Sequence, residues 1–331
     1  MHFNHDVWLC FSGGNAIGAY HAGAYEALSE NGIEPTAIAG ASIGAIIAAL
    51  IAGNAAGERA RKLKQFWSLA EQSSLLPDAK QSRLAGGLQT LMSGRPGLFH
   101  PRIDWSMFGM PSRTSLFDPA PMRRELQALI DFDQLNSGAI RVIVTAVDVE
   151  SGELRSFDTL REQLTVDHLM ASTAFPVFFP PVQLHEKYYV DPGVVCNLPI
   201  EPLFADMPAN KVTCFAFDAA IPHGSVPDGV DAALIRAQDI LFSAQSRYAL
   251  ARIRRRLESS PGDSGSARSS IRHYTFRDEA NMETGLKMID FRSDSLKQRW
   301  AEGRRTVLSA LNQGSVENEQ TDTGVTVQPQ L

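Results

Sequence analysis

Cysteine is scarce in this sequence. The three cysteines, Cys10, Cys196 and Cys214, are an odd number and lack the spacing of a metal site. We therefore expect small buried side chains in a reducing compartment, without a disulfide framework. This scarcity favours a cytoplasmic protein and gives no sign of a structural metal.

The sequence also lacks a membrane-spanning run, a secretory leader and an excess of positive charge. The longest apolar run, residues 43–52, has about half the length that a membrane-spanning helix needs. Residues 1–11 have no cationic lead, and their apolar run is too short for a signal peptide. The net charge of −6 excludes a global basic field that would attract nucleic acid. We predict a cytoplasmic protein whose membrane contact, if it has one, is peripheral and local.

Positive charge gathers in one place, along a helix predicted for residues 231–257. Its arginines are Arg247, Arg252, Arg254, Arg255 and Arg256. We favour a solvated helix face that the acidic chain balances, and a peripheral patch for anionic lipid is the alternative.

The overall composition is that of an ordinary globular chain. Of the 331 residues, 44% are hydrophobic and 21% are charged, which suits one large domain with a sizeable core. We predict that this domain spans residues 1–311. The polar residues 312–331 cannot bury a core and are predicted to be a disordered tail. Residues 259–270, which are rich in serine and glycine, are predicted to be a flexible connection.

Short apolar strands alternate with helical spacing at the start of the chain. The pattern predicts strands at residues 7–11 and 36–39, each followed by a helix, at residues 18–29 and 43–52. Alternation of this kind predicts an α/β fold, a three-layer α/β/α arrangement with a mainly parallel central sheet.

Further elements extend the same pattern toward the C-terminus. The segment at residues 75–115 is predicted to be irregular because four prolines interrupt it, and its apolar side chains either pack on the core or form a lid or acyl-chain wall. The other predicted elements are strands at 141–149, 153–157 (a hairpin with its predecessor), 182–190, 212–217 and 272–276, and helices at 58–72, 166–172, 231–257 and 293–311.

The second strand ends in a candidate nucleophile motif, Gly40-Ala41-Ser42-Ile43-Gly44. This run matches G-x-S-x-G, in which small flanking residues allow a sharp strand-to-helix turn that exposes the serine hydroxyl. Ser42 would then lie at the N-terminus of the following helix, where free N–H groups favour negative charge on the reacting oxygen. A tight turn without catalysis is the alternative.

A glycine-rich loop follows the first strand. Residues 12–18, Ser-Gly-Gly-Asn-Ala-Ile-Gly, place several backbone N–H groups in one concave turn that suits an anion. The anion is either a cofactor pyrophosphate or the oxyanion of an ester under attack by serine. We favour the oxyanion, because Asn15 stands where a dinucleotide fingerprint needs its second glycine.

The serine needs a base, and two kinds of residue compete for this role. A Ser-His-Asp triad would need His223 or His273, but Ser42 follows only the second strand, which is too early for the α/β-hydrolase order. A partly desolvated carboxylate within reach of the hydroxyl can serve instead. Asp191 is the best candidate, because it ends a strand and precedes the turn Pro192-Gly193, whereas Asp148 and Asp218 have weaker claims.

Taken together, these segments resemble the patatin-like phospholipase family. The glycine loop at residues 13–18, the G-x-S-x-G elbow at 40–44 and the acid motif Asp191-Pro192-Gly193 stand in the family's order. The passage from residue 171 to the acid motif and on to residue 199 is also similar, and the resemblance covers roughly residues 6–220.

The resemblance implies a serine lipid acyl hydrolase without a metal or cofactor. It assigns Ser42 as nucleophile, Asp191 as base, and the backbone N–H groups of Gly13, Gly14 and Asn15 as oxyanion donors. The implied substrate is a phospholipid or another fatty-acyl ester, and the alternative is an inactive member that only binds lipid.

Three residues depart from the family pattern. Asn15 replaces a glycine, although asparagine tolerates left-handed backbone better than most residues. Ile17 replaces an arginine and so removes a cation, and Pro192 replaces a glycine and deletes one N–H donor after Asp191.

Overall fold

The structure is a computed structural model that describes residues 5–73, 78–102, 114–206, 208, 210–259 and 269–317. Its strands are β1 (Asp6–Phe11), β2 (Ala37–Ala41), β3 (His100–Pro101), β4 (Phe117–Asp118), β5 (Arg141–Asp148), β6 (Leu154–Asp158), β7 (Val182–Leu184), β8 (Lys187–Val190), β9 (Val212–Asp218) and β10 (Ser270–Thr275). Its α-helices are α1 (Ala19–Glu30), α2 (Ile43–Ala52), α3 (Ala56–Ala70), α4 (Lys80–Ser93), α5 (Ala120–Leu129), α6 (Phe132–Leu135), α7 (Val166–Ser172), α8 (Val230–Ser259) and α9 (Ser293–Glu317).

The central sheet is mixed and mostly parallel. Its strand order is β10-β9-β1-β2-β5-β8-β7, with β6 also paired to β5. The five strands from β10 to β5 in this order pair in parallel, whereas β6, β7 and β8 join by antiparallel pairs. The α/β fold predicted from the alternation is confirmed.

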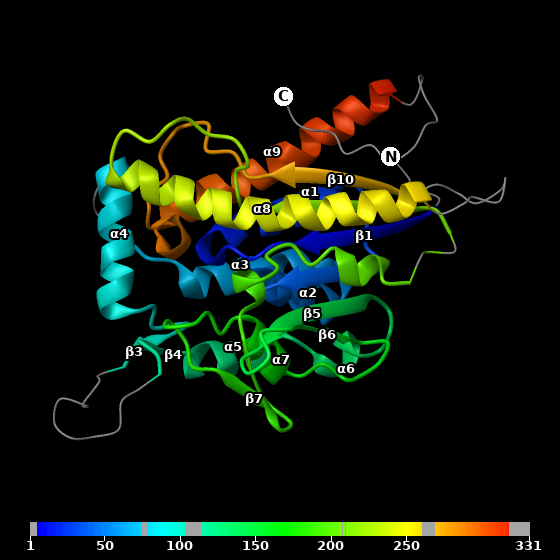
Figure 1. Ribbon diagram of the computed structural model, residues 1–331, viewed down its shortest axis with the longest axis horizontal. Helices are drawn as coiled ribbons and strands as arrows, with labels where there is room; N and C mark the ends of the chain where they lie inside the picture. The colour runs from blue at the N-terminus through cyan, green and yellow to red at the C-terminus, as the bar shows by residue number, and fades with distance from the viewer. Residues whose placement is uncertain are drawn as a thin grey trace.

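Helices cover both faces of this sheet, as Figure 1 shows. Along β1, Leu9 and Phe11 belong to the core under α1, α2 and α3, while Trp8 and Cys10 belong to a second core under α8. Because successive side chains of a strand point to opposite faces, this alternation buries both sides. The predicted three layers are therefore present.

Helices α1 and α9 pack against each other at backbone distance. A Cβ atom added to Gly23 would lie 2.0 Å from the carbonyl oxygen of Trp300, and one added to Gly303 would lie 1.9 Å from that of Tyr20. Both positions need glycine because no side chain fits between the two helices. This crossing fixes the C-terminal helix on the N-terminal half of the fold.

Three predicted elements were wrong in detail. The segment predicted to be irregular contains helix α4, which fits because no proline lies between residues 78 and 95. The strand predicted for residues 182–190 is the hairpin of β7 and β8, and it turns at His185, whose φ is 54°. The last helix extends beyond residue 311 to Glu317.

Other predictions fall on residues outside the described part of the chain. These are residues 103–113, at the centre of the segment predicted either to pack on the core or to form a lid, most of the predicted flexible connection, residues 260–268, and the remainder of the predicted tail, residues 318–331.

The topology brings the two loops of interest together. Strands β1 and β2 are adjacent and parallel, and Phe11 at the end of β1 pairs with Gly40 near the end of β2. The glycine loop and the G-x-S-x-G elbow therefore leave the sheet at the same carboxyl edge, where α/β proteins bind ligands.

Candidate active site

Ser42 lies in a strained turn between β2 and α2. Its backbone has φ 54° and ψ −125°, a conformation that residues with side chains rarely adopt. A Cβ on Gly40 would lie 2.3 Å from the backbone of Gly44, and a Cβ on Gly44 would lie 2.3 Å from the carbonyl oxygen of Phe11. The predicted elbow thus has a steric cause, because only glycine fits on either side of Ser42.

The amide of Ser42 is held by a residue that the sequence analysis missed. The N–H of Ser42 donates to the hydroxyl oxygen of Ser172 over 2.9 Å, and Ser172 is fully buried at the end of α7. This bond keeps the backbone of the elbow in place. Ser172 belongs to the passage that resembles the family, but nothing in its residue type points to this role.

Asp191 follows β8 and lines the same cavity as Ser42. The residue is 2% exposed, and its Oδ1 accepts a hydrogen bond from the N–H of Gly193 over 2.8 Å. Burial raises the pKa of Asp191 to about 7, although the neighbouring Ser42 hydroxyl and the N–H of Gly193 act to lower this pKa. The carboxyl group can therefore accept and return a proton near neutral pH.

The proline after Asp191 does not deprive the carboxylate of backbone support. Pro192 begins a short 3₁₀ helix, Pro192–Val194, and the bond to the carboxylate comes from the next residue, Gly193. Proline lacks an N–H, but it fits the first position of such a turn, where that group is not needed.

The glycine loop lies directly against Ser42. A Cβ added to Gly13 would be 3.2 Å from the Cβ of Ser42. However, the N–H of Gly13 donates to the carbonyl of Asn197 over 3.0 Å, which argues against the predicted role of Gly13 as an oxyanion donor. The N–H groups of Gly14 and Asn15 have no acceptor among the described residues.

The loop conformation explains two of the departures from the family pattern. Asn15 has φ 48°, the left-handed conformation that asparagine was predicted to tolerate. Ile17 is fully buried in the core, where a charged side chain would need a partner. In this chain the side chain at position 17 therefore packs in the core.

Gln245 of helix α8 makes two hydrogen bonds to the loop that carries Asp191. Its Oε1 accepts from the N–H of Asn197 over 2.8 Å, and its Nε2 donates to the carbonyl of Gly193 over 3.1 Å. One side chain thus holds both ends of the segment between the acid and the residue that binds Gly13. No motif could have predicted this role, because a glutamine in a long helix belongs to no recognisable pattern.

A cavity of about 350 Å³ opens beside Ser42 and Asp191. At one end it has polar groups from the glycine loop, the elbow and the acid loop, and elsewhere its walls are almost entirely apolar. The apolar lining residues are Ile43, Ile46, Phe66, Trp67, Leu98, Phe99, Met122, Phe175, Phe178, Phe179, Leu234, Leu241, Phe242, Leu286, Met288, Ile289 and Phe291.

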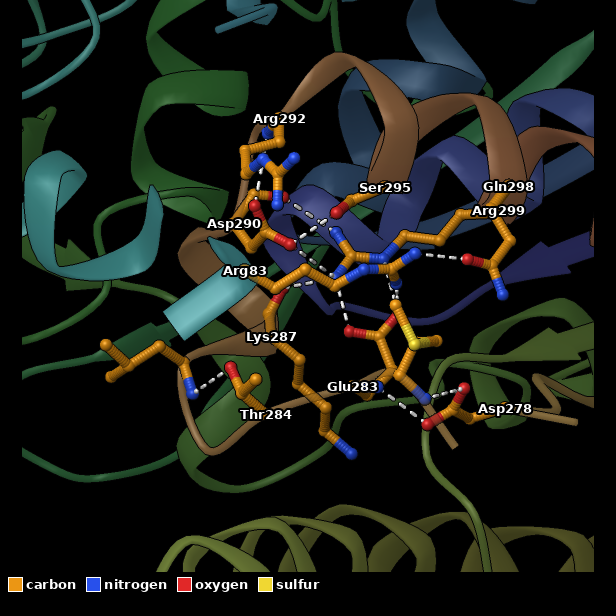
Figure 2. Close-up of polar contacts among 12 residues, drawn as sticks. Arg83, Asp278, Glu283, Thr284, Lys287, Asp290, Arg292, Ser295, Gln298 and Arg299 are labelled. Atoms are coloured by element: carbon orange, nitrogen blue, oxygen red, sulfur yellow. Dashed lines mark hydrogen bonds and ion pairs between the residues drawn. The ribbon is translucent and has the colours of Figure 1, made fainter. Parts of the chain in front are cut away.

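One wall of this cavity, residues 285–291, is fixed by buried charges (Figure 2). Arg299 is fully buried and donates to both carboxylate oxygens of Glu283, over 2.8 and 2.6 Å. Arg299 also donates to the carbonyls of Lys287 and Asp290, and the ammonium group of Lys287 lies 2.7 Å from Asp239 on α8. Burial alone would raise the pKa of Glu283, but Arg299 and Arg83 hold it below its usual range.

The competing bases lie elsewhere. No histidine of the described residues lines the cavity. His223 is exposed in a loop, and His273 lies 3.5 Å from Asp218. Asp148 pairs with Lys187 over 2.6 Å, and neither Asp148 nor Asp218 lines the cavity. Of the predicted candidate bases, Asp191 alone lines the cavity together with Ser42.

The comparison with family models agrees with the geometry. The model of the patatin-like phospholipases matches residues 9–204, more than half of the chain. The chain belongs to the patatin-like phospholipase family. No curated protein sequence matches it.

The chain is also similar to several solved structures. The chain is similar to VipD from Legionella pneumophila, with a TM-score of 0.44, 14% identity, and coverage of 94% of this chain and 67% of VipD. It is also similar to human GIVD cytosolic phospholipase A2, with a TM-score of 0.45, 10% identity, and coverage of 95% of this chain and 59% of the enzyme. For ExoU in its complex with SpcU from Pseudomonas aeruginosa, the TM-score is 0.32 at 17% identity, over 95% and 61% of the two chains.

No helix in the described part of the chain combines the length and the apolar character needed to cross a membrane.

Proposed function

We propose that this protein hydrolyses fatty-acyl esters, with Ser42 as the nucleophile and Asp191 as the general base. The observation that carries the proposal is that Ser42, in its strained elbow, and the buried Asp191 line the same end of an apolar cavity. The raised pKa of Asp191, about 7, supports its role as a base. Membership of a family of lipid hydrolases supports the same reaction.

The first step forms an acyl-enzyme. Asp191 takes the proton of the Ser42 hydroxyl as its oxygen attacks the ester carbonyl carbon, and the carbonyl oxygen becomes an oxyanion. The unpartnered N–H groups of Gly14 and Asn15 are the proposed donors to this oxyanion. The ester bond then breaks, and the leaving alcohol takes the proton from Asp191.

The second step releases the fatty acid. Asp191 accepts a proton from water, whose oxygen attacks the acyl carbon, and the proton returns to the oxygen of Ser42 as the acyl bond breaks. A carboxyl group with a pKa near neutrality suits both directions of transfer.

The cavity favours a substrate with a long apolar acyl part. Its lining offers phenylalanine, leucine, isoleucine and methionine side chains and few hydrogen-bonding groups away from Ser42. A phospholipid or another fatty-acyl ester would place its acyl chain among them and its ester beside Ser42.

Labelling by a fluorophosphonate probe tests the nucleophile. We expect the wild-type protein to be labelled at Ser42 and to hydrolyse a p-nitrophenyl acyl ester, and Ser42→Ala to lose both. Ser68→Ala, which changes an exposed serine of α3 outside the cavity, is a control for nonspecific labelling. A protein that binds acyl ligands but is never labelled would instead be the non-catalytic member of the family.

A further inference from the structure

The first half of helix α8 has its apolar residues on the outside. Every exposed residue between 230 and 241 is apolar. We call this surface the α8 face; it consists of Val230, Ala233, Leu234, Ala237, Ile240 and Leu241. Val230 is 89% exposed, Ile240 49% and Leu241 55%. The α8 face is therefore a continuous apolar surface open to solvent.

The polar residues of the same stretch point toward the protein. Asp231 accepts from the N–H of Gly285 over 2.7 Å, and Gln238 donates to the carbonyl of Gly285 over 2.7 Å. Asp239 is buried against Lys287, and Arg236 donates to the carbonyl of Ile221. A surface helix of a water-soluble domain has the opposite arrangement, with its apolar stripe inward. This inverted arrangement indicates that the exposed side of α8 contacts an apolar partner.

The α8 face is continuous with the cavity beside Ser42. Leu234 and Leu241 are exposed on this face and also line the cavity. A molecule that lies against the face therefore meets the cavity without crossing a polar rim at these residues. Figure 1 shows α8 running along the outside of the molecule over its whole length.

The second half of the helix changes to residues typical of a lipid–water boundary. Arg247 and Tyr248 are exposed, Tyr248 to 68%, and they are followed by further exposed arginines. Tyrosine and arginine have an apolar body and a polar end, which suits the headgroup level of a bilayer. Anionic headgroups would complement this end of the helix, although the chain as a whole is acidic.

We propose that the α8 face is the surface that docks on the lipid aggregate containing the substrate. The apolar half of α8 lies among the acyl chains near the surface, the arginine-bearing half lies among the headgroups, and an acyl chain passes between Leu234 and Leu241 into the cavity. The proposal deepens the proposed function, on which it rests for the identity of the ligand.

Flotation with vesicles of phosphatidylcholine and phosphatidylglycerol tests the docking. The measurement uses Ser42→Ala protein, so that hydrolysis does not alter the vesicles. The test variant adds Val230→Ser, Ala237→Glu and Ile240→Ser, none of which lines the cavity. We expect vesicle binding to fall at least about tenfold, because each buried apolar side chain adds to the affinity. The matched control is Leu160→Ser, on an exposed leucine (67%) outside α8, and it should bind like the parent.

The active parent separates this proposal from the proposed function. In a background with Ser42, the triple variant should hydrolyse a soluble short-chain ester at the wild-type rate and vesicle lipid more slowly. Unchanged vesicle binding by the triple variant, or an equal loss with Leu160→Ser, would overturn the docking. The docking would also be overturned if light scattering showed that the parent protein is a dimer, that the triple variant is a monomer, and that the parent does not bind vesicles. Vesicle binding by a protein that cleaves no ester would instead overturn the proposed function alone.

Discussion

The N–H of Gly13 donates to the carbonyl of Asn197 over 3.0 Å and so joins the glycine loop after β1 to the loop that carries Asp191. Asn197 is in turn held by Gln245 of α8. The glycine loop, the acid loop and helix α8, which are far apart in the chain, are therefore joined by one continuous set of hydrogen bonds. Their mutual placement depends on a helix that carries none of the family motifs.

Replacing Gln245 by alanine should lower turnover more than stability. Both of its hydrogen bonds hold the acid loop, and a small displacement of Asp191 from Ser42 reduces the rate by roughly 10- to 100-fold. We expect kcat to fall by this amount with KM nearly unchanged, measured on a soluble acyl ester. Gln183→Ala, on the exposed side of β7, is the matched control. A loss confined to thermal stability would show that Gln245 is only structural.

Asp191→Asn should yield an inactive protein that is more stable than the wild type at alkaline pH. The folded pKa of Asp191, about 7, is above the ordinary value of 3.8, so the folded protein resists ionisation of this group. The free energy of unfolding of the wild type therefore declines as the pH rises from the unfolded pKa to the folded one, by about 1.4 kcal/mol for each pH unit. Asparagine avoids this cost and can still accept from Gly193.

Denaturant titrations of both proteins over a range of pH test this difference. The two unfolding free energies should converge in acid and separate by a few kcal/mol above about pH 8. A constant difference at every pH would mean that Asp191 is not buried as a titrating group.

The pH profile of the wild-type enzyme should follow the same group. Because Asp191 must be deprotonated to act as base, kcat/KM should rise with pH, reach half of its maximum near pH 7 and then level off. A histidine would titrate in a similar range, so His223→Gln and His273→Gln are the controls. If either variant abolished the inflection, the base would be a histidine.

The sequence allowed the prediction of whatever depends on a short local pattern. The elbow at Ser42 and the loop at Asn15 could be predicted because their backbone conformations demand particular residue types nearby. The place of Asp191 directly after a strand, at the same cavity as Ser42, could be predicted because its segment resembles the acid motif of the family.

Features that depend on contacts between distant segments could not be predicted. Ser172 and Gln245 act through hydrogen bonds to residues 130 and 52 positions away along the chain. The occupied N–H of Gly13 likewise depends on a residue near position 200. The spacing of residue types along one sequence carries no record of such pairs.

The glycine contact between α1 and α9 should be sensitive to a single methyl group. In Gly303→Ala the new Cβ would lie 1.9 Å from the carbonyl oxygen of Tyr20, so the helices must separate. We expect a loss of about 2–3 kcal/mol of unfolding free energy. Gly57→Ala in α3, where a Cβ meets nothing within 4 Å, should be neutral or stabilise by up to about 1 kcal/mol. Equal effects of the two substitutions would contradict the close packing.

The buried charges behind the cavity wall should be far more sensitive than charges on the exposed surface. Arg299→Met leaves Glu283 buried at 4% exposure without its bidentate partner, which is expected to cost about 3–5 kcal/mol. Arg161→Met removes a partner of Asp206 at 3.7 Å, with both side chains more than two thirds exposed, and should cost less than about 1 kcal/mol. Urea unfolding of both variants measures the contrast.

The same charges fix the wall of the acyl cavity, so Arg299→Met should also raise KM for long-chain esters more than KM for short-chain esters. A purely global loss of stability would leave the ratio of the two KM values unchanged.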